Sequence, residues 1–110
     1  MTIKTEVIEY SQDGSTFEGK LTSDDAISEP LPGVVICHAW GGLSDYELDA
    51  AHKLAELGYA AFCLDVYGKG VRGSGPEENA KLMQPLLEDR ALLQSRLLRG
   101  LEVAAAASAI

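Results

Sequence analysis

Two apolar runs near the middle of the chain, separated by a helix pattern, restrict the fold more than any other feature. The first run covers residues 34–39 and leads into a turn at Gly41 and Gly42, and the second run covers residues 59–64. Short continuous apolar runs of this kind are typical of strands covered on both faces. Residues 33–65 therefore predict a strand-helix-strand unit with two parallel strands and a right-handed crossover.

Residues with capping roles mark both ends of the helix between these runs. Ser44 and Glu47 are spaced as a capping box, in which each side chain bonds the backbone N–H of the other residue. Leu43 and Leu48 stand at the two positions of a hydrophobic staple. Gly58 is placed as the residue that follows the C-cap. The pattern predicts a helix that begins directly after Ser44 and ends before Gly58.

The segment before this unit has a strand pattern. Residues 3–10 and 16–22 flank turn residues at positions 11–14, which predicts an antiparallel β-hairpin. Residues 23–32 contain two prolines and no periodicity, so we expect a surface loop that leads the chain into the core.

The last third of the chain carries helix signals. Pro76 is well placed as the first residue of a helix, and Pro85 allows a second start or a kink. From there on, one face of a long amphipathic helix collects the apolar residues Leu86, Leu93, Leu97, Leu101 and Ala104. The whole sequence predicts a single α/β domain over residues 1–110.

The charge balance excludes several kinds of partner. The chain has 17 acidic and 9 basic side chains and a formal net charge of -8, which repels nucleic acid and anionic membrane surfaces. The N-terminus lacks the charged start and apolar run of a signal peptide, and no apolar run is long enough to span a bilayer. We expect a cytoplasmic protein that binds neither nucleic acid nor membrane.

Residues 68–73 fit the pattern G-x-G-x-x-G between a strand and a helix, which raises the possibility of a dinucleotide site. In that motif the third glycine lies in the first turn of the helix, whereas Ser74 and Gly75 still separate Gly73 from the expected start at Pro76. No spacing of His, Cys, Asp and Glu suggests a metal site. The sequence therefore predicts no cofactor and no metal.

The cysteines and histidines are expected to be structural. Cys37 and Cys63 lie inside the apolar runs, which predicts two reduced, buried thiols. Successive strand residues point to opposite faces, so His38 is not expected to pair with Cys37. A buried structural histidine is the prediction for His38, although the end of a strand is also where ligands bind in such sheets. His52 is expected on the helix surface.

Three separated motifs resemble the dienelactone hydrolase family of α/β-hydrolases. They are Val-Val-Ile-Cys-His-Ala-Trp-Gly-Gly at 34–42, Ala-Glu-Leu-Gly-Tyr-Ala at 55–60 and Leu-Asp-Val-Tyr-Gly-Lys-Gly at 64–70. They occur in the order and spacing of the family, and the similarity extends from residue 3 to about residue 103. The resemblance implies a partial α/β-hydrolase fold, made of the hairpin, the parallel strand-helix-strand unit and the long C-terminal helix.

The resemblance also implies roles for individual residues. The loop after the first buried strand would supply one backbone N–H of an oxyanion hole, here from Trp40. Trp40, Tyr67 and Lys69 would contact the substrate, and Lys69 matches a basic residue that binds a substrate carboxylate. Founding members of the family carry a glutamate beside the histidine of this loop, and this chain has Ala39 there.

The nucleophile, aspartate and histidine of the family's catalytic triad would all follow later in the chain. No Gly-x-Ser-x-Gly or Gly-x-Cys-x-Gly occurs in these 110 residues. The resemblance therefore implies the N-terminal half of an ester or lactone hydrolase, with no triad residue and no activity alone.

Two alternatives without catalysis remain open. The first is a self-associating module, most simply a homodimer that joins two sheets through the exposed strand at 34–39 or buries the leucine face of the 86–104 helix. The second is a module that binds a small carboxylate or lactone at Trp40, Tyr67 and Lys69.

Overall fold

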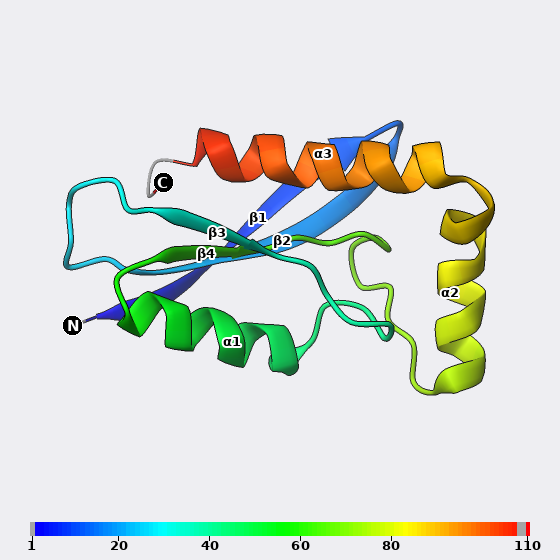
Figure 1. The fold of residues 1–110 in the computed structure, drawn as a ribbon, viewed down its shortest axis with the longest axis horizontal. Coiled ribbons are helices and arrows are strands. Elements are labelled where there is room, and N and C mark those ends of the chain that lie inside the picture. The colour runs from blue at the N-terminus through cyan, green and yellow to red at the C-terminus, as the bar shows by residue number, and fades with distance from the viewer. Residues whose placement is uncertain (1, 108–109) are drawn as a thin grey trace.

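The computed structural model describes residues 2–107 and residue 110. Its strands form a four-stranded mixed sheet in the order β1-β2-β4-β3. In chain order the elements are β1 (Ile3–Gln12), β2 (Ser15–Asp24), β3 (Gly33–Ile36), α1 (Asp45–Glu56), β4 (Ala60–Cys63), α2 (Pro76–Glu88) and α3 (Arg90–Ala106). Figure 1 shows α1 on one face of the sheet, α3 on the other face, and α2 across one end. The predicted α/β fold is confirmed.

The N-terminal hairpin is longer than the sequence predicted. β1 pairs with β2 in antiparallel register, with Tyr10 opposite Phe17. Asp13 and Gly14 form the turn with φ of 51° and 81°, as a two-residue hairpin turn requires. β2 then pairs antiparallel with β4, so the hairpin joins the central unit in one sheet.

The parallel pair is present but shorter than predicted. β3 and β4 pair over four residues each, from Gly33 opposite Ala60 to Ile36 opposite Cys63. The chain leaves the sheet after Ile36, so Cys37 is exposed and the prediction of a buried thiol there is wrong. Cys63 is buried, as predicted.

The predicted caps of α1 are confirmed. The Glu47 carboxylate accepts the backbone N–H of Ser44 at 2.8 Å, and both halves of the capping box are present. Gly58 has a φ of 98°, and Tyr59 N–H donates to the carbonyl of Leu54 at 3.1 Å. These features form the Schellman ending that favours glycine at this position.

The C-terminal segment forms two helices, one of the two arrangements that Pro85 allowed. α2 begins at Pro76, as predicted, and contains Pro85. The backbone then breaks at Asp89, with φ of -127° and ψ of 85°. The Asp89 side chain accepts the backbone N–H of Leu92 at 3.1 Å and so caps α3. The predicted long C-terminal helix is therefore confirmed as α3, but it begins at Arg90 rather than at Leu86, which lies in α2.

The face of α3 that packs on the sheet is centred on small residues. Gly100 and Ala104 are buried, and a Cβ on Gly100 would lie 3.0 Å from the Leu64 side chain. Leu101 is 52% exposed, contrary to its predicted place in the buried stripe. Close approach of helix and sheet therefore depends on Gly100. Within the described residues, no helix has the length and apolar character needed to cross a bilayer.

Candidate functional site

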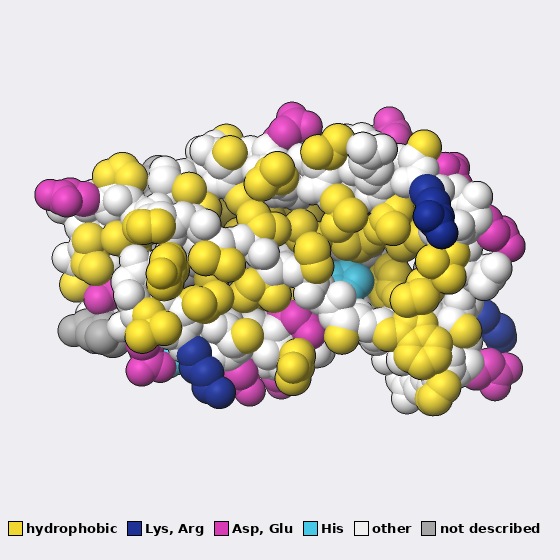
Figure 2. All heavy atoms as spheres, viewed as in Figure 1, with side chains coloured by type: hydrophobic (Ala, Val, Ile, Leu, Met, Phe, Trp, Pro, Cys, Tyr) yellow, Lys and Arg dark blue, Asp and Glu magenta, His cyan; other side chains and the backbone are white. Residues whose placement is uncertain are grey.

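The loops that follow β3 and β4 meet at one end of the sheet and, with α2 and α3, line a partly open cavity of about 250 Å³. Figure 2 shows hydrophobic side chains gathered around a hollow on this side of the molecule. The loops contribute Cys37, His38, Ala39, Trp40, Val66 and Tyr67, and the helices contribute Met83, Leu86, Leu87, Leu93 and Leu97. The carboxyl ends of parallel strands are where open α/β sheets bind ligands.

His38 connects the two loops through both of its ring nitrogens. Its Nε2 lies 3.0 Å from the backbone N of Val66, and its Nδ1 lies 2.9 Å from the carbonyl oxygen of Ala39. A backbone N–H only donates and a carbonyl only accepts, so Nδ1 carries the proton and Nε2 accepts. The ring is a neutral, structural imidazole, as expected, although it is half-buried rather than fully buried.

The peptide between Ala39 and Trp40 is held in one orientation. The Ala39 carbonyl accepts hydrogen bonds from His38 Nδ1 and from the backbone N–H of Gly42 at 3.0 Å. In a trans peptide the N–H points away from the C=O, so these bonds also fix the direction of the Trp40 N–H. Among the described residues, that N–H has no hydrogen-bond acceptor.

Glu47 ties the start of α1 to the same loop. Its side chain is 2% exposed, and its Oε2 accepts the backbone N–H of Ala39 at 3.4 Å while Oε1 serves the capping box. The sequence predicts the capping box, whereas the contact to Ala39 depends on the folded path of the loop and was not predicted.

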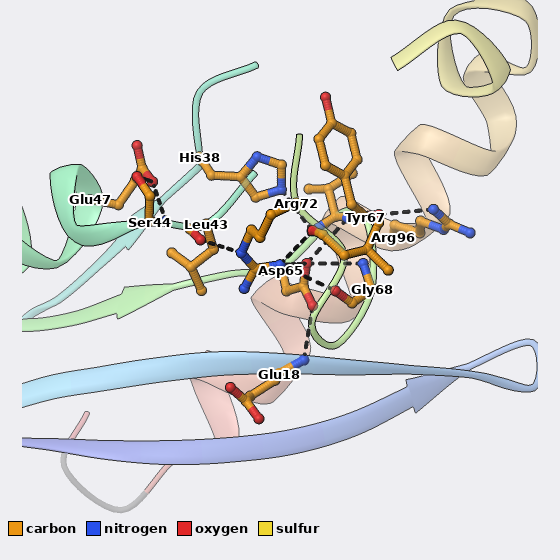
Figure 3. A network of polar contacts seen from close by, with 12 residues as sticks. Glu18, His38, Leu43, Ser44, Glu47, Asp65, Tyr67, Gly68, Arg72 and Arg96 are labelled. Carbon is orange, nitrogen blue, oxygen red and sulfur yellow. Dashed lines mark hydrogen bonds and ion pairs between the residues drawn. The ribbon is translucent and has the colours of Figure 1, made fainter. Parts of the chain in front are cut away.

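Asp65 organises the loop after β4 and thereby places Tyr67. Its fully buried carboxylate accepts the backbone N–H groups of Tyr67 at 3.2 Å, Gly68 at 3.0 Å and Glu18 at 3.0 Å (Figure 3). Sequence reasoning did not single out Asp65. An aspartate directly between an apolar run and a glycine-rich turn is the signal that points to it.

Tyr67 closes the contact between the two loops. Its hydroxyl donates to the carbonyl oxygen of Trp40 at 2.8 Å, and its ring lies 4.8 Å from the His38 ring. Burial raises the pKa of the Tyr67 phenol, so the hydroxyl stays protonated and able to donate at neutral pH. The structure therefore brings together two of the predicted site residues, Trp40 and Tyr67.

Comparison with known proteins identifies the scaffold. The sequence profile of the dienelactone hydrolase family matches residues 17–109. The chain belongs to the dienelactone hydrolase family. A solved structure named m3DLH is 30% identical with a TM-score of 0.94, and a dienelactone hydrolase-like promiscuous phosphotriesterase from metagenomic libraries is 25% identical with a TM-score of 0.93. No curated protein matches the chain.

The alignments to these two dienelactone hydrolase structures include all of this chain but only part of each solved chain. Each alignment covers 100% of this chain and 46% of the solved chain. The chain therefore spans about half the length of the dienelactone hydrolase structures that it resembles.

Lys69 lies apart from the other predicted site residues of this dienelactone hydrolase scaffold. Its Nζ is 3.2 Å from a carboxylate oxygen of Glu9, and its backbone N–H donates to Thr16 at 2.9 Å. Lys69 does not line the cavity formed around Trp40 and Tyr67. Within the described part of the chain, no cluster of three His, Cys, Asp or Glu residues is placed to hold a metal ion.

Proposed function

We propose that this chain supplies the oxyanion-hole loop and one wall of the acyl pocket of a carboxylic ester or lactone hydrolase. The observation that carries the proposal is the Trp40 N–H, which has a fixed direction and no acceptor among the described residues. Trp40 itself lines an apolar cavity at the end of the parallel strands. Backbone donors held in advance of the reaction are what an oxyanion hole requires.

The chemistry assigned to this N–H is stabilisation of negative charge. When a nucleophile attacks an ester carbonyl, the carbonyl oxygen gains charge and accepts hydrogen bonds from such donors. The side chain of residue 40 takes no part in this interaction, so the role tolerates variation at that position. The match to the dienelactone hydrolase family supports a lactone, which is a cyclic carboxylic ester, as the substrate class.

We propose that the chain alone does not complete this reaction. A thiol nucleophile needs a base or a lowered pKa. Burial raises the pKa of Cys63 to about 11. Cys37 follows β3 directly beside His38, but the single lone pair of the neutral His38 ring accepts the N–H of Val66. The nucleophile and its base would therefore come from polypeptide beyond these residues.

A hydrolysis assay on the purified 110-residue chain tests this proposal. With a nitrophenyl ester as substrate, we expect no turnover above the uncatalysed rate. Turnover that disappears when Cys37 or Cys63 is alkylated would overturn the proposal, because the chain would then carry its own nucleophile.

As a second candidate, we propose self-association of this chain. β3 is an edge strand of the described sheet, and its residues Val34, Val35 and Ile36 are only half-buried. Figure 2 shows hydrophobic side chains across the face between α1 and α3, and Leu98 on α3 is 51% exposed. Exposed apolar edges favour pairing with a second strand. Light scattering that finds only monomer at micromolar concentration would contradict a dimer.

A further inference from the structure

We infer that the cavity beside Trp40 binds an uncharged, apolar acyl group and discriminates against a carboxylate. This inference rests on the proposed function and names the substrate class of the same site. It differs from the carboxylate-binding role that the resemblance implied for Lys69. Three observations carry it: the side chains that line the cavity, the engagement of the nearby cations elsewhere, and the size of the cavity.

The helical wall of the cavity is aliphatic. α2 and α3 contribute Met83, Leu86, Leu87, Leu93 and Leu97, and no Lys or Arg lines the cavity among the described residues. Such a wall gains free energy from each methylene that it removes from water. An acyl chain laid against it gains roughly fourfold in affinity for each added methylene until the cavity is filled.

Three cations on the segments around the cavity have other partners. Lys69 is paired with Glu9 at 3.2 Å. Arg72 donates to backbone carbonyls, with 2.7 Å to Val71, 3.3 Å to Gly68 and a further bond to Leu43 (Figure 3).

Arg96 is held in a similar way. It donates to the carbonyl of Val66 at 2.9 Å, and its guanidinium lies over the Phe17 ring at 5.1 Å. Because no Lys or Arg lines the cavity among the described residues, a carboxylate that enters it loses hydration without gaining a positive partner on the wall. An ester carbonyl needs only a hydrogen-bond donor, and the Trp40 N–H is one.

The size of the cavity suits a small acyl group. Its volume is about 250 Å³, which lies below the roughly 300–1,000 Å³ of sites for drug-sized ligands.

Tryptophan fluorescence gives a direct test, because Trp40 is the single tryptophan of the chain and lines the cavity. Methyl hexanoate, methyl butanoate and hexanoate are titrated into the full 110-residue chain at about pH 7, where hexanoate is ionised. We expect a saturable change in Trp40 emission with methyl hexanoate. Methyl butanoate should bind more weakly by roughly fourfold for each methylene removed, and hexanoate by about tenfold or more.

Three variants connect the result to the cavity wall. Met83→Lys places an ammonium group on the wall and is expected to tighten hexanoate binding by about tenfold. Gln84→Lys is the matched control, because it adds a positive charge at the exposed neighbour on α2, outside the cavity. Lys69→Ala is expected to leave the binding of both ligands unchanged.

Three results would overturn the inference. They are equal binding of hexanoate and methyl hexanoate, a clear loss of hexanoate binding in Lys69→Ala, and the absence of any saturable change with methyl hexanoate while circular dichroism shows a folded chain. The titration measures binding without turnover. Its outcome is therefore distinct from that of the hydrolysis assay, which tests the proposed function.

Discussion

The imidazole of His38 accepts a hydrogen bond from the backbone N–H of Val66 at 3.0 Å, across a sequence separation of 28 residues. The same ring donates from Nδ1 to the carbonyl of Ala39. One neutral side chain thus fixes the loop after β3 against the loop after β4 and orients the peptide that carries the Trp40 N–H. His38 is a positioning residue for the proposed oxyanion donor.

Replacement of His38 by alanine should destabilise the fold. Val66 is buried, so its N–H would lose its partner at a cost of about 1–3 kcal/mol. Urea unfolding measures the change. His52→Ala is the control, because His52 is exposed and pairs with the exposed Glu56 on the same helix, and its effect should stay within about 0.5 kcal/mol. Nitrogen NMR of the wild type should show the Nδ1–H tautomer of His38, and an Nε2–H tautomer would contradict this account.

Asp65→Asn should lower the free energy of unfolding more than a substitution at an exposed position does. The buried carboxylate accepts three backbone N–H groups, and an amide presents donors to some of them. Hydrogen bonds to a charged group contribute about 1.5–3 kcal/mol, so a loss of that order in unfolding free energy is expected. Trp40 emission should also change, because Tyr67 bonds the Trp40 carbonyl. If Asp65→Asn behaves like the exposed control Asp49→Asn, Asp65 does not organise the loop.

Local signals predicted the elements of the fold well. The capping box at Ser44 and the glycine after α1 are short-range patterns with few alternatives, and both are confirmed. Strand lengths were harder to predict from the sequence, because the end of β3 is set by its register with β4. That register left Cys37 outside the sheet. Pro85 indicated a second helix start, but the break itself lies at Asp89, and the helix periodicity that continues on both sides does not locate it.

The candidate site was only partly predictable for a related reason. Trp40 and Tyr67 stand in motifs with a family pattern, and the structure brings them together. The roles of Glu47 and Asp65 depend on the folded path of the chain. Glu47 contacts Ala39 in the preceding loop, and Asp65 contacts Glu18, which lies 47 residues earlier in the sequence. Lys69 matched a motif position, but its pairing with Glu9 depends on where the hairpin lies.

The two cysteines should differ strongly in reactivity. Cys37 is exposed and Cys63 is buried. Burial, with a smaller contribution from the charge of Glu47, raises the pKa of the Cys63 thiol to about 11, and the thiolate is the reactive form. An aromatic disulfide reagent at about pH 8 should therefore modify one thiol in the folded chain and two in denaturant. Cys37→Ser identifies which thiol reacts, and rapid modification of its remaining cysteine in the folded state would contradict the burial of Cys63.

Asp24 should make the fold sensitive to acid. Hydrogen bonds from the backbone N–H groups of Thr2, the larger cause, and of Ala26 hold the pKa of the Asp24 carboxyl below its ordinary 3.8. Between the folded pKa and 3.8, the unfolded chain binds more protons, so stability rises with pH. The contribution is present above this window and is lost as pH falls through the folded pKa.

The Asp24→Asn variant tests that sign. The loss of unfolding free energy relative to wild type should be larger at about pH 6 than at about pH 3. Asp13→Asn serves as the control, because it makes the same replacement of a carboxylate by an amide at an exposed turn position. Asparagine tolerates the positive φ at that position. A loss for Asp24→Asn that is the same at both pH values would contradict the account.

The central claim is that the Trp40 N–H is an oxyanion donor that awaits a nucleophile from other polypeptide. The most direct test is ester hydrolysis by a fusion of this chain to the part of m3DLH that it does not span, measured beside the chain alone. We predict turnover by the fusion and none by the chain. Trp40→Pro, which removes the N–H, should lower kcat of the fusion by about 10²–10³, while Trp40→Phe should leave it nearly unchanged. Turnover by the chain alone, or equal activity of the two Trp40 variants, would contradict the claim.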